Sequence, residues 1–141
     1  MGDVPPRRIG RSVLALLAGF VLVVVLSIAA DAVLHAAGVY PPLGQPMSAG
    51  LLLLATIYRA VFAVAGSYTT ARLAPHHPME HALFGGFIGL LLGLAGAIAQ
   101  WNRPDTIGAH WYPVALVVLS LPQAWLGGKI VTMQARAGAT A

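Results

Sequence analysis

The stretch that decides the fold is Val13–Ala30, VLALLAGFVLVVVLSIAA, which runs for 18 residues without a charge. The hydrocarbon core of a bilayer is about 30 Å thick, and a helix needs about 20 residues to cross it. A helix that continues through Asp31 to about Val39 reaches that length. The stretch therefore predicts a first membrane-spanning helix.

Three further apolar segments follow the first, and short turns separate them. The turns contain Pro41, Pro46, Pro75 and Pro104, residues that interrupt helices. Because short connections place consecutive helices antiparallel, we predict an all-α fold, an integral membrane antiparallel four-helix bundle. It forms a single membrane domain over residues 1–141. The spans are expected at about residues 12–39, 48–72, 79–100 and 111–130.

The composition agrees with a membrane protein and excludes several other classes. Of the 141 residues, 58% are hydrophobic and 9% are charged, whereas soluble domains are about 45–50% apolar and about 25% charged. The absence of cysteine excludes disulfides and iron–sulfur clusters, and we expect no cofactor. The net charge of +4 comes from residues beside apolar runs, so the expected partner is the lipid bilayer and not nucleic acid.

The basic residues indicate how the chain is oriented in the membrane. Lys and Arg are enriched in cytoplasmic loops. With four spans, six of them share the side of the two termini: Arg7, Arg8, Arg11, Arg72, Lys129 and Arg136. The opposite side has Arg103, and an aromatic boundary of Tyr40, Trp101, Trp111 and Tyr112. We predict both termini in the cytoplasm. The first apolar run exceeds the roughly 7–15 residues of a signal peptide, so we expect a retained helix.

Two charges fall inside the predicted spans, Asp31 in the first and Arg59 in the second. Either charge alone would cost several kcal/mol near the bilayer centre. Asp31 lies about 12 Å below the end of its helix at Val39, and Arg59 about 16 Å below the same boundary at Ser48. Since the two helices form a hairpin, we predict that the two side chains pair.

Asp31 has polar companions on its own helix. Ser27, Asp31 and His35 follow an i, i+4, i+8 spacing, which places them on one face. Together with Arg59 they form a predicted intramembrane polar cluster. One interpretation is a proton relay or a cation site, and the other is a structural pair that fixes how the first two helices dock.

The turn before the third span contains a candidate metal site. His77 and His81 lie four residues apart with Glu80 between them, a spacing that can hold zinc on a helix. Pro78, however, suits the first helical position, which places His77 outside the helix. We therefore expect no metal at this turn.

The loop before the fourth span adds Asp105 and His110. If the loop folds over the helix ends, these two residues approach His35 and form a group of metal-ligating type. Nothing in the spacing requires that arrangement, and a solvated cap with aromatic anchors is the expected alternative.

The third span is predicted to be a packing element. Gly85, Gly89 and Gly93 form a GxxxGxxxG series, and small residues let helix backbones approach closely in a membrane. The partner of this face is either another helix of the same chain, which four helices in one bundle favour, or a second protomer. A homo-oligomer or a larger membrane complex therefore stays open.

Three stretches carry a resemblance to known proteins: GSYTTARLAP at 66–75, HALFGGFIGLLLG at 81–93 and LPQAWLGGKI at 121–130. In these the chain resembles the small uncharacterised four-helix inner-membrane proteins of bacteria. The resemblance implies a multi-pass protein of the bacterial inner (plasma) membrane and implies no agreed activity.

The chain also has a superficial likeness to the small multidrug resistance transporters. Those proteins have four short helices and an acidic residue in the first, and Asp31 resembles that residue in place. They are dual-topology antiparallel dimers with a weak charge bias, whereas this chain has a strong bias. Arg59 would also neutralise Asp31. These departures argue against drug–proton antiport.

Two classes of function stay open for the sequence. A non-enzymatic structural or accessory subunit of a membrane complex is favoured, because most of the intramembrane surface is apolar or glycine-rich. The alternative is a small proton- or cation-coupled transporter that uses the cluster of Asp31, His35 and Arg59. An enzyme is not expected, because no nucleophile–base pair or carboxylate dyad is visible.

Overall fold

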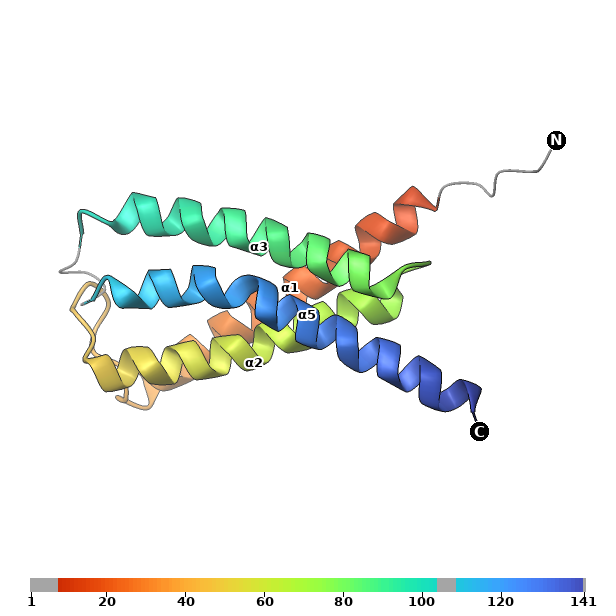
Figure 1. The fold of residues 1–141 in the computed structure, drawn as a ribbon. Helices are drawn as coiled ribbons and strands as arrows, with labels where there is room; N and C mark the ends of the chain where they lie inside the picture. Colours follow the sequence, from red (N-terminus) through yellow and green to blue (C-terminus); the bar gives the residue numbers. More distant parts are fainter. Residues whose placement is uncertain (1–7, 104–108, 141) are drawn as a thin grey trace.

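The computed structural model describes residues 8–103 and 109–140, and within these ranges the chain is all-α (Figure 1). Its helices are α1 (Ile9–Ala36), α2 (Ala49–Leu73), α3 (Pro78–Gln100) and α5 (Trp111–Ala139). Each of the four is long and apolar enough to cross a membrane. The prediction of an all-α chain with four such helices is confirmed.

Local sequence sets the helix limits. The Ser48 side chain caps α2 by accepting a hydrogen bond from the backbone N–H of Leu51 at 3.4 Å. Helix α3 begins at Pro78, which needs no N–H donor in the first turn. Helix α1 ends at Ala36, three residues before the expected limit, because the chain turns back at Gly38, where φ is +70°. Helix α5 continues to Ala139, nine residues past the expected limit.

The helices run antiparallel, so the bundle has two distinct ends (Figure 1). The terminal end holds the start of α1 and the end of α5, and the tyrosine end holds the end of α1 and the start of α5. Helix α2 is central, because it packs extensively against both α1 and α5 and also contacts α3. Helix α3 packs mainly on α5, and α1 packs mainly on α2 with few contacts to α3. Figure 1 shows α1 diverging from α3 toward the tyrosine end.

Small residues produce the closest helix contacts. A Cβ on Gly66 would lie 2.8 Å from the Gly19 carbonyl oxygen, and one on Gly127 would lie 2.8 Å from the Val64 carbonyl oxygen. Gly86 faces Ala124 of α5 just as closely. Backbones approach this closely only where side chains are missing, so these glycines fix the crossings of α1 on α2, α5 on α2, and α3 on α5.

The GxxxGxxxG series of α3 packs only in part. A Cβ on Gly85 would meet Leu16, and one on Gly93 would meet Val117, each at an ordinary 3.4 Å. Gly89 is exposed and would have nothing within 4 Å among the described residues. The internal packing expected of the whole series is therefore absent at Gly89. The reason is the rotation of α3, which directs Gly86, outside the series, into the tightest contact.

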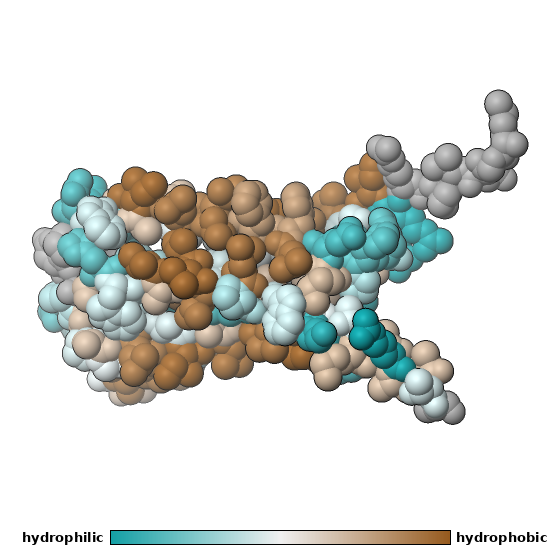
Figure 2. All heavy atoms as spheres, viewed as in Figure 1, coloured by the Kyte–Doolittle hydropathy of each residue, from teal (hydrophilic) through white to brown (hydrophobic). Residues whose placement is uncertain are grey.

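Most of the apolar surface lies outside the bundle. In the most apolar window of each helix, no more than 22% of the residues are buried. On the face drawn in Figure 2, hydrophobic residues form a band around the middle of the bundle, between hydrophilic residues at its two ends. This distribution is what a bilayer requires and what water disfavours.

Candidate functional site

An ion pair joins α1 to α2 within the bundle. The Arg59 Nη2 donates a hydrogen bond to Oδ2 of Asp31 at 2.5 Å, and each side chain is 32% exposed. Asp31 lies five residues before the end of α1, about 8 Å along its axis, and Arg59 lies ten residues after the start of α2, about 15 Å along. The long arginine side chain spans this offset. The predicted pairing of these two residues is confirmed.

Two tyrosines complete the surroundings of the carboxylate. The hydroxyl of Tyr58 donates to Oδ1 of Asp31, and the hydroxyl of Tyr40 donates to that of Tyr58 at 3.1 Å. Tyr40 is only 6% exposed, although it lies in the turn after α1. Both carboxylate oxygens therefore accept a hydrogen bond from α2, which is how a charge withdrawn from water is stabilised.

The other members of the predicted polar cluster are placed differently. His35 contacts the backbone of Asp31, since its Nδ1 lies 2.7 Å from the Asp31 carbonyl oxygen, and its ring packs edge-on against Tyr40. Ser27 makes no side-chain hydrogen bond within the described ranges and does not line the pocket described next. The cluster thus consists of Asp31 and Arg59, with His35 at its edge and Ser27 apart from it.

The ion pair lines a pocket of about 350 Å³ near the tyrosine end, to which all four helices contribute. Small-molecule sites commonly measure about 300–1,000 Å³. One part of the lining is polar and comprises Asp31, His35, Tyr40, Tyr58, Arg59, Gln100 and Tyr112. The other part is apolar or lacks side chains, and comprises Met47, Leu52, Ala55, Gly93, Gly96, Ala97, Pro113 and Leu116. A pocket of this size and mixed lining has the dimensions of a small-molecule site.

Two hydrogen-bond donors at the pocket have no acceptor in the described part of the chain. The Nε of Arg59 is buried and makes no hydrogen bond there. Tyr112 also lines the pocket, and its hydroxyl makes no hydrogen bond to a described residue. Buried donors normally find acceptors, so the Arg59 Nε marks the position at which a buried group of the site lacks a partner.

Sequence reasoning missed the tyrosines. The sequence predicts Tyr40 and Tyr112 as boundary aromatics, and its pattern gives Tyr58 no role. The available signal was Tyr58 itself, because a hydroxyl near the middle of an apolar span requires a partner. It is also the direct neighbour of Arg59 in the chain.

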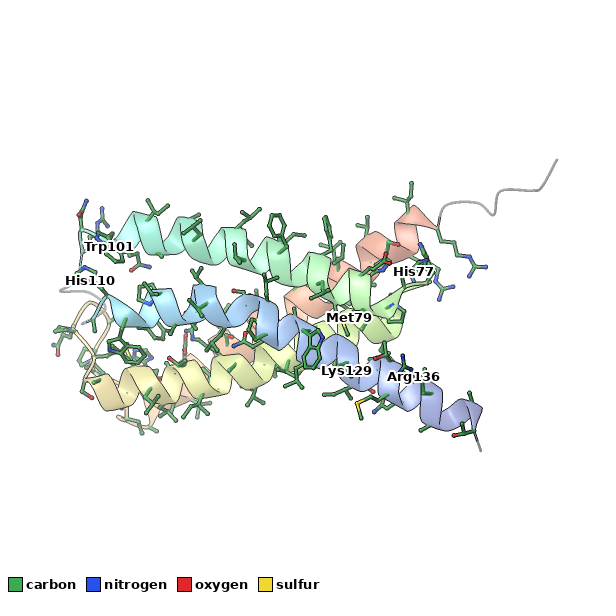
Figure 3. All side chains as sticks on the ribbon, in the orientation of Figure 1. His77, Met79, Trp101, His110, Lys129 and Arg136 are labelled. Carbon is green, nitrogen blue, oxygen red and sulfur yellow. The ribbon has the colours of Figure 1, made fainter. Side chains whose placement is uncertain are left out.

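The histidine turn lies at the terminal end, away from the pocket. His77 adopts the left-handed conformation outside α3 and lies 3.5 Å from Glu80, with both side chains exposed; Figure 3 labels His77 there. His81 instead contacts α1, with its Nε2 2.9 Å from the hydroxyl oxygen of Ser12. Among the described residues no group of three metal-ligating side chains is placed to hold an ion.

At the tyrosine end, His110 packs against Trp101, as Figure 3 shows. The His110 Nε2 lies 2.9 Å from the Trp101 carbonyl oxygen. This contact joins the end of α3 to the residue before α5. Asp105, the other residue of the predicted loop cluster, lies outside the described residues.

Comparisons with known proteins add no assignment. No model of a protein family matches the chain, and no curated protein or solved structure matches it either. The chemistry of the pocket and the surfaces of the helices are therefore the only guides to function.

Proposed function

We propose that the chain is a multi-pass integral membrane protein of the bacterial inner (plasma) membrane, with both termini in the cytoplasm. Four helices of sufficient length and apolarity support this, as does the small buried share of their apolar windows. Burial in lipid offsets the cost that so much exposed apolar surface has in water. The basic residues at the terminal end favour the cytoplasmic side for that end, which puts the pocket near the opposite surface.

Within the membrane, the protein acts as a non-enzymatic structural or accessory subunit. The observation that supports this best is the bonding of Asp31, whose two carboxylate oxygens both accept hydrogen bonds from α2. A carboxylate held in this way fastens α1 to α2 and is not free to coordinate a cation. Between the pocket and the terminal end, the contact of Gly19 with Gly66 packs α1 closely on α2.

A proton- or cation-coupled transporter is the second candidate. The pocket favours it, because Asp31 and His35 line a space that reaches the tyrosine end. The chain Tyr40–Tyr58–Asp31 also forms a line of hydroxyls that leads to a carboxylate. Transport would require α1 to move relative to α3, which it contacts only weakly.

One experiment separates the two candidates. The full chain and the double variant Asp31→Asn/Arg59→Gln are reconstituted into vesicles, and an internal pH dye reports proton flux under an imposed gradient. The subunit proposal predicts no flux above that of empty vesicles for either protein. Flux from the unmodified chain that the double variant abolishes would instead establish transport and overturn the subunit proposal.

A further inference from the structure

The charges of the pocket restrict what it can hold. Asp31 and Arg59 lie 2.5 Å apart, so the pair has no net charge. An anion placed against Arg59 would also face the carboxylate, and a cation placed against Asp31 would also face the guanidinium. Either ion is therefore opposed by the second charge of the pair. The favoured occupant is therefore uncharged.

The hydrogen-bond donors and acceptors of the pocket restrict its occupant further. The oxygens of Asp31 already accept from Tyr58 and Arg59, and the Tyr40 hydroxyl already donates to Tyr58. The one buried side-chain polar group without a partner in the described part of the chain is a donor, the Arg59 Nε–H. The Tyr112 hydroxyl, which can also donate, makes no hydrogen bond to a described residue. Their complement is a hydrogen-bond acceptor, and a carbonyl oxygen is a strong acceptor that carries no net charge.

The rest of the pocket suits an apolar body. Leu52, Ala97 and Leu116 form part of its wall, while Gly93 and Gly96 leave α3 flat there. Gly96 is exposed and has open space where a Cβ would stand. Helix α1 diverges from α3 on this side of the bundle and has few contacts with it (Figure 1).

We infer that this pocket binds an uncharged lipophilic carbonyl compound, whose oxygen accepts hydrogen bonds from Arg59 and Tyr112. The inference rests on the proposed membrane location. Bilayers supply this chemistry from two sources, the head group of an isoprenoid quinone and the acyl ester of a glycerolipid. Both place a carbonyl on an apolar body, and the experiment below distinguishes them.

The test places the full chain in nanodiscs of diether phosphatidylcholine, a lipid without carbonyl groups. The NMR signal of the Arg59 Nε–H group is then followed, with Arg59→Lys used to assign it. Addition of decylubiquinone forms the quinone arm, and exchange to diester phosphatidylcholine without quinone forms the ester arm. A downfield, saturable shift in either arm supports the inference and identifies the source. The absence of a shift in both the quinone arm and the ester arm would overturn the inference.

A matched pair of glycine variants shows where binding occurs. Gly96 lines the pocket and Gly89 does not, yet both are exposed on α3 with nothing within 4 Å of a built Cβ. Both leucine variants are therefore expected to fold. Gly96→Leu should reduce binding at least 10-fold, while Gly89→Leu leaves it unchanged. Equal behaviour of the two variants would overturn the inference.

A second pair tests the donor. Tyr112→Phe keeps the ring and removes the hydroxyl, and should weaken binding about 5- to 10-fold, the effect of one neutral hydrogen bond. Tyr68→Phe, at the other end of α2, should have no effect. Unchanged binding in Tyr112→Phe would contradict the inference. Failure of the unmodified chain to enter nanodiscs as a helical protein would instead refute the membrane location.

Discussion

Gly19 of α1 and Gly66 of α2 meet backbone to backbone, and a Cβ on Gly66 would stand 2.8 Å from the Gly19 carbonyl oxygen. Because α1 has few contacts with α3, this crossing and the Asp31–Arg59 pair carry the docking of α1. The two contacts lie 12 residues apart on α1, about 18 Å along its axis. Helix α1 is thus held against α2 at two points, one by close backbone packing and the other by an ion pair.

The close backbone contact between Gly19 and Gly66 predicts that an added side chain destabilises the protein. Gly66→Ala places a methyl group against a carbonyl oxygen that cannot move without shifting α1, so we expect a loss of about 1–3 kcal/mol in the free energy of unfolding. Gly89→Ala is the matched control and should change it by less than about 0.5 kcal/mol, since its Cβ meets nothing. Unfolding by added SDS in mixed micelles, followed by circular dichroism, measures both. Equal losses would refute the assigned role of the crossing.

The hydrogen bonds around the Asp31 carboxylate predict that the Tyr58 hydroxyl stabilises the fold. Tyr58→Phe removes the donor to Oδ1 of Asp31 and leaves the Tyr40 hydroxyl without its acceptor. Hydrogen bonds to charged groups contribute about 1.5–3 kcal/mol, so we expect a loss in the lower part of that range for this half-buried pair. Tyr68→Phe removes an exposed bond to Gln134 and should cost much less. The same SDS titration applies, and a Tyr58→Phe variant as stable as the original would contradict this assignment.

The helices and the ion pair could be predicted from the sequence because each depends only on distances along the chain. Uninterrupted apolar length predicts a helix, and an axial rise per residue predicts that Asp31 and Arg59 lie at related heights. No knowledge of how the helices rotate is needed for either. The early end of α1 changed the height of Asp31 by a few ångströms, which the flexible arginine side chain accommodates.

The parts that could not be predicted depend on rotation and on turn geometry. Helix α3 has glycines on more than one face, so the sequence could not decide that Gly86, and not Gly89, meets α5. Tyr40 enters the core because its backbone N–H bonds to the Leu34 carbonyl and folds the turn back onto the bundle. Tyr40 and the α3 residues Gly93 and Gly96 line the pocket, and a linear pattern contains neither the rotation of α3 nor the fold of the turn.

The proposed orientation predicts a labelling pattern. The chain has no cysteine, so a single introduced thiol is the only reactive site. Leu43, 87% exposed in the turn between α1 and α2, and Gly138, near the end of α5, lie at opposite ends of the bundle. In intact cells an impermeant maleimide should label Leu43→Cys, whereas Gly138→Cys should react only after lysis. The reverse pattern would invert the topology, and labelling of both in intact cells would refute the four-span arrangement.

The central claim is that Asp31 and Arg59 neutralise one another inside the bundle, and a double-mutant cycle tests it most directly. Unfolding free energies are measured for the original chain, Asp31→Asn, Arg59→Gln and the double variant under the same SDS titration. Each single change leaves one charge without its partner, so the double variant should lose less than the sum of the two. We predict a favourable coupling of about 1–3 kcal/mol. A coupling indistinguishable from zero would contradict the claim.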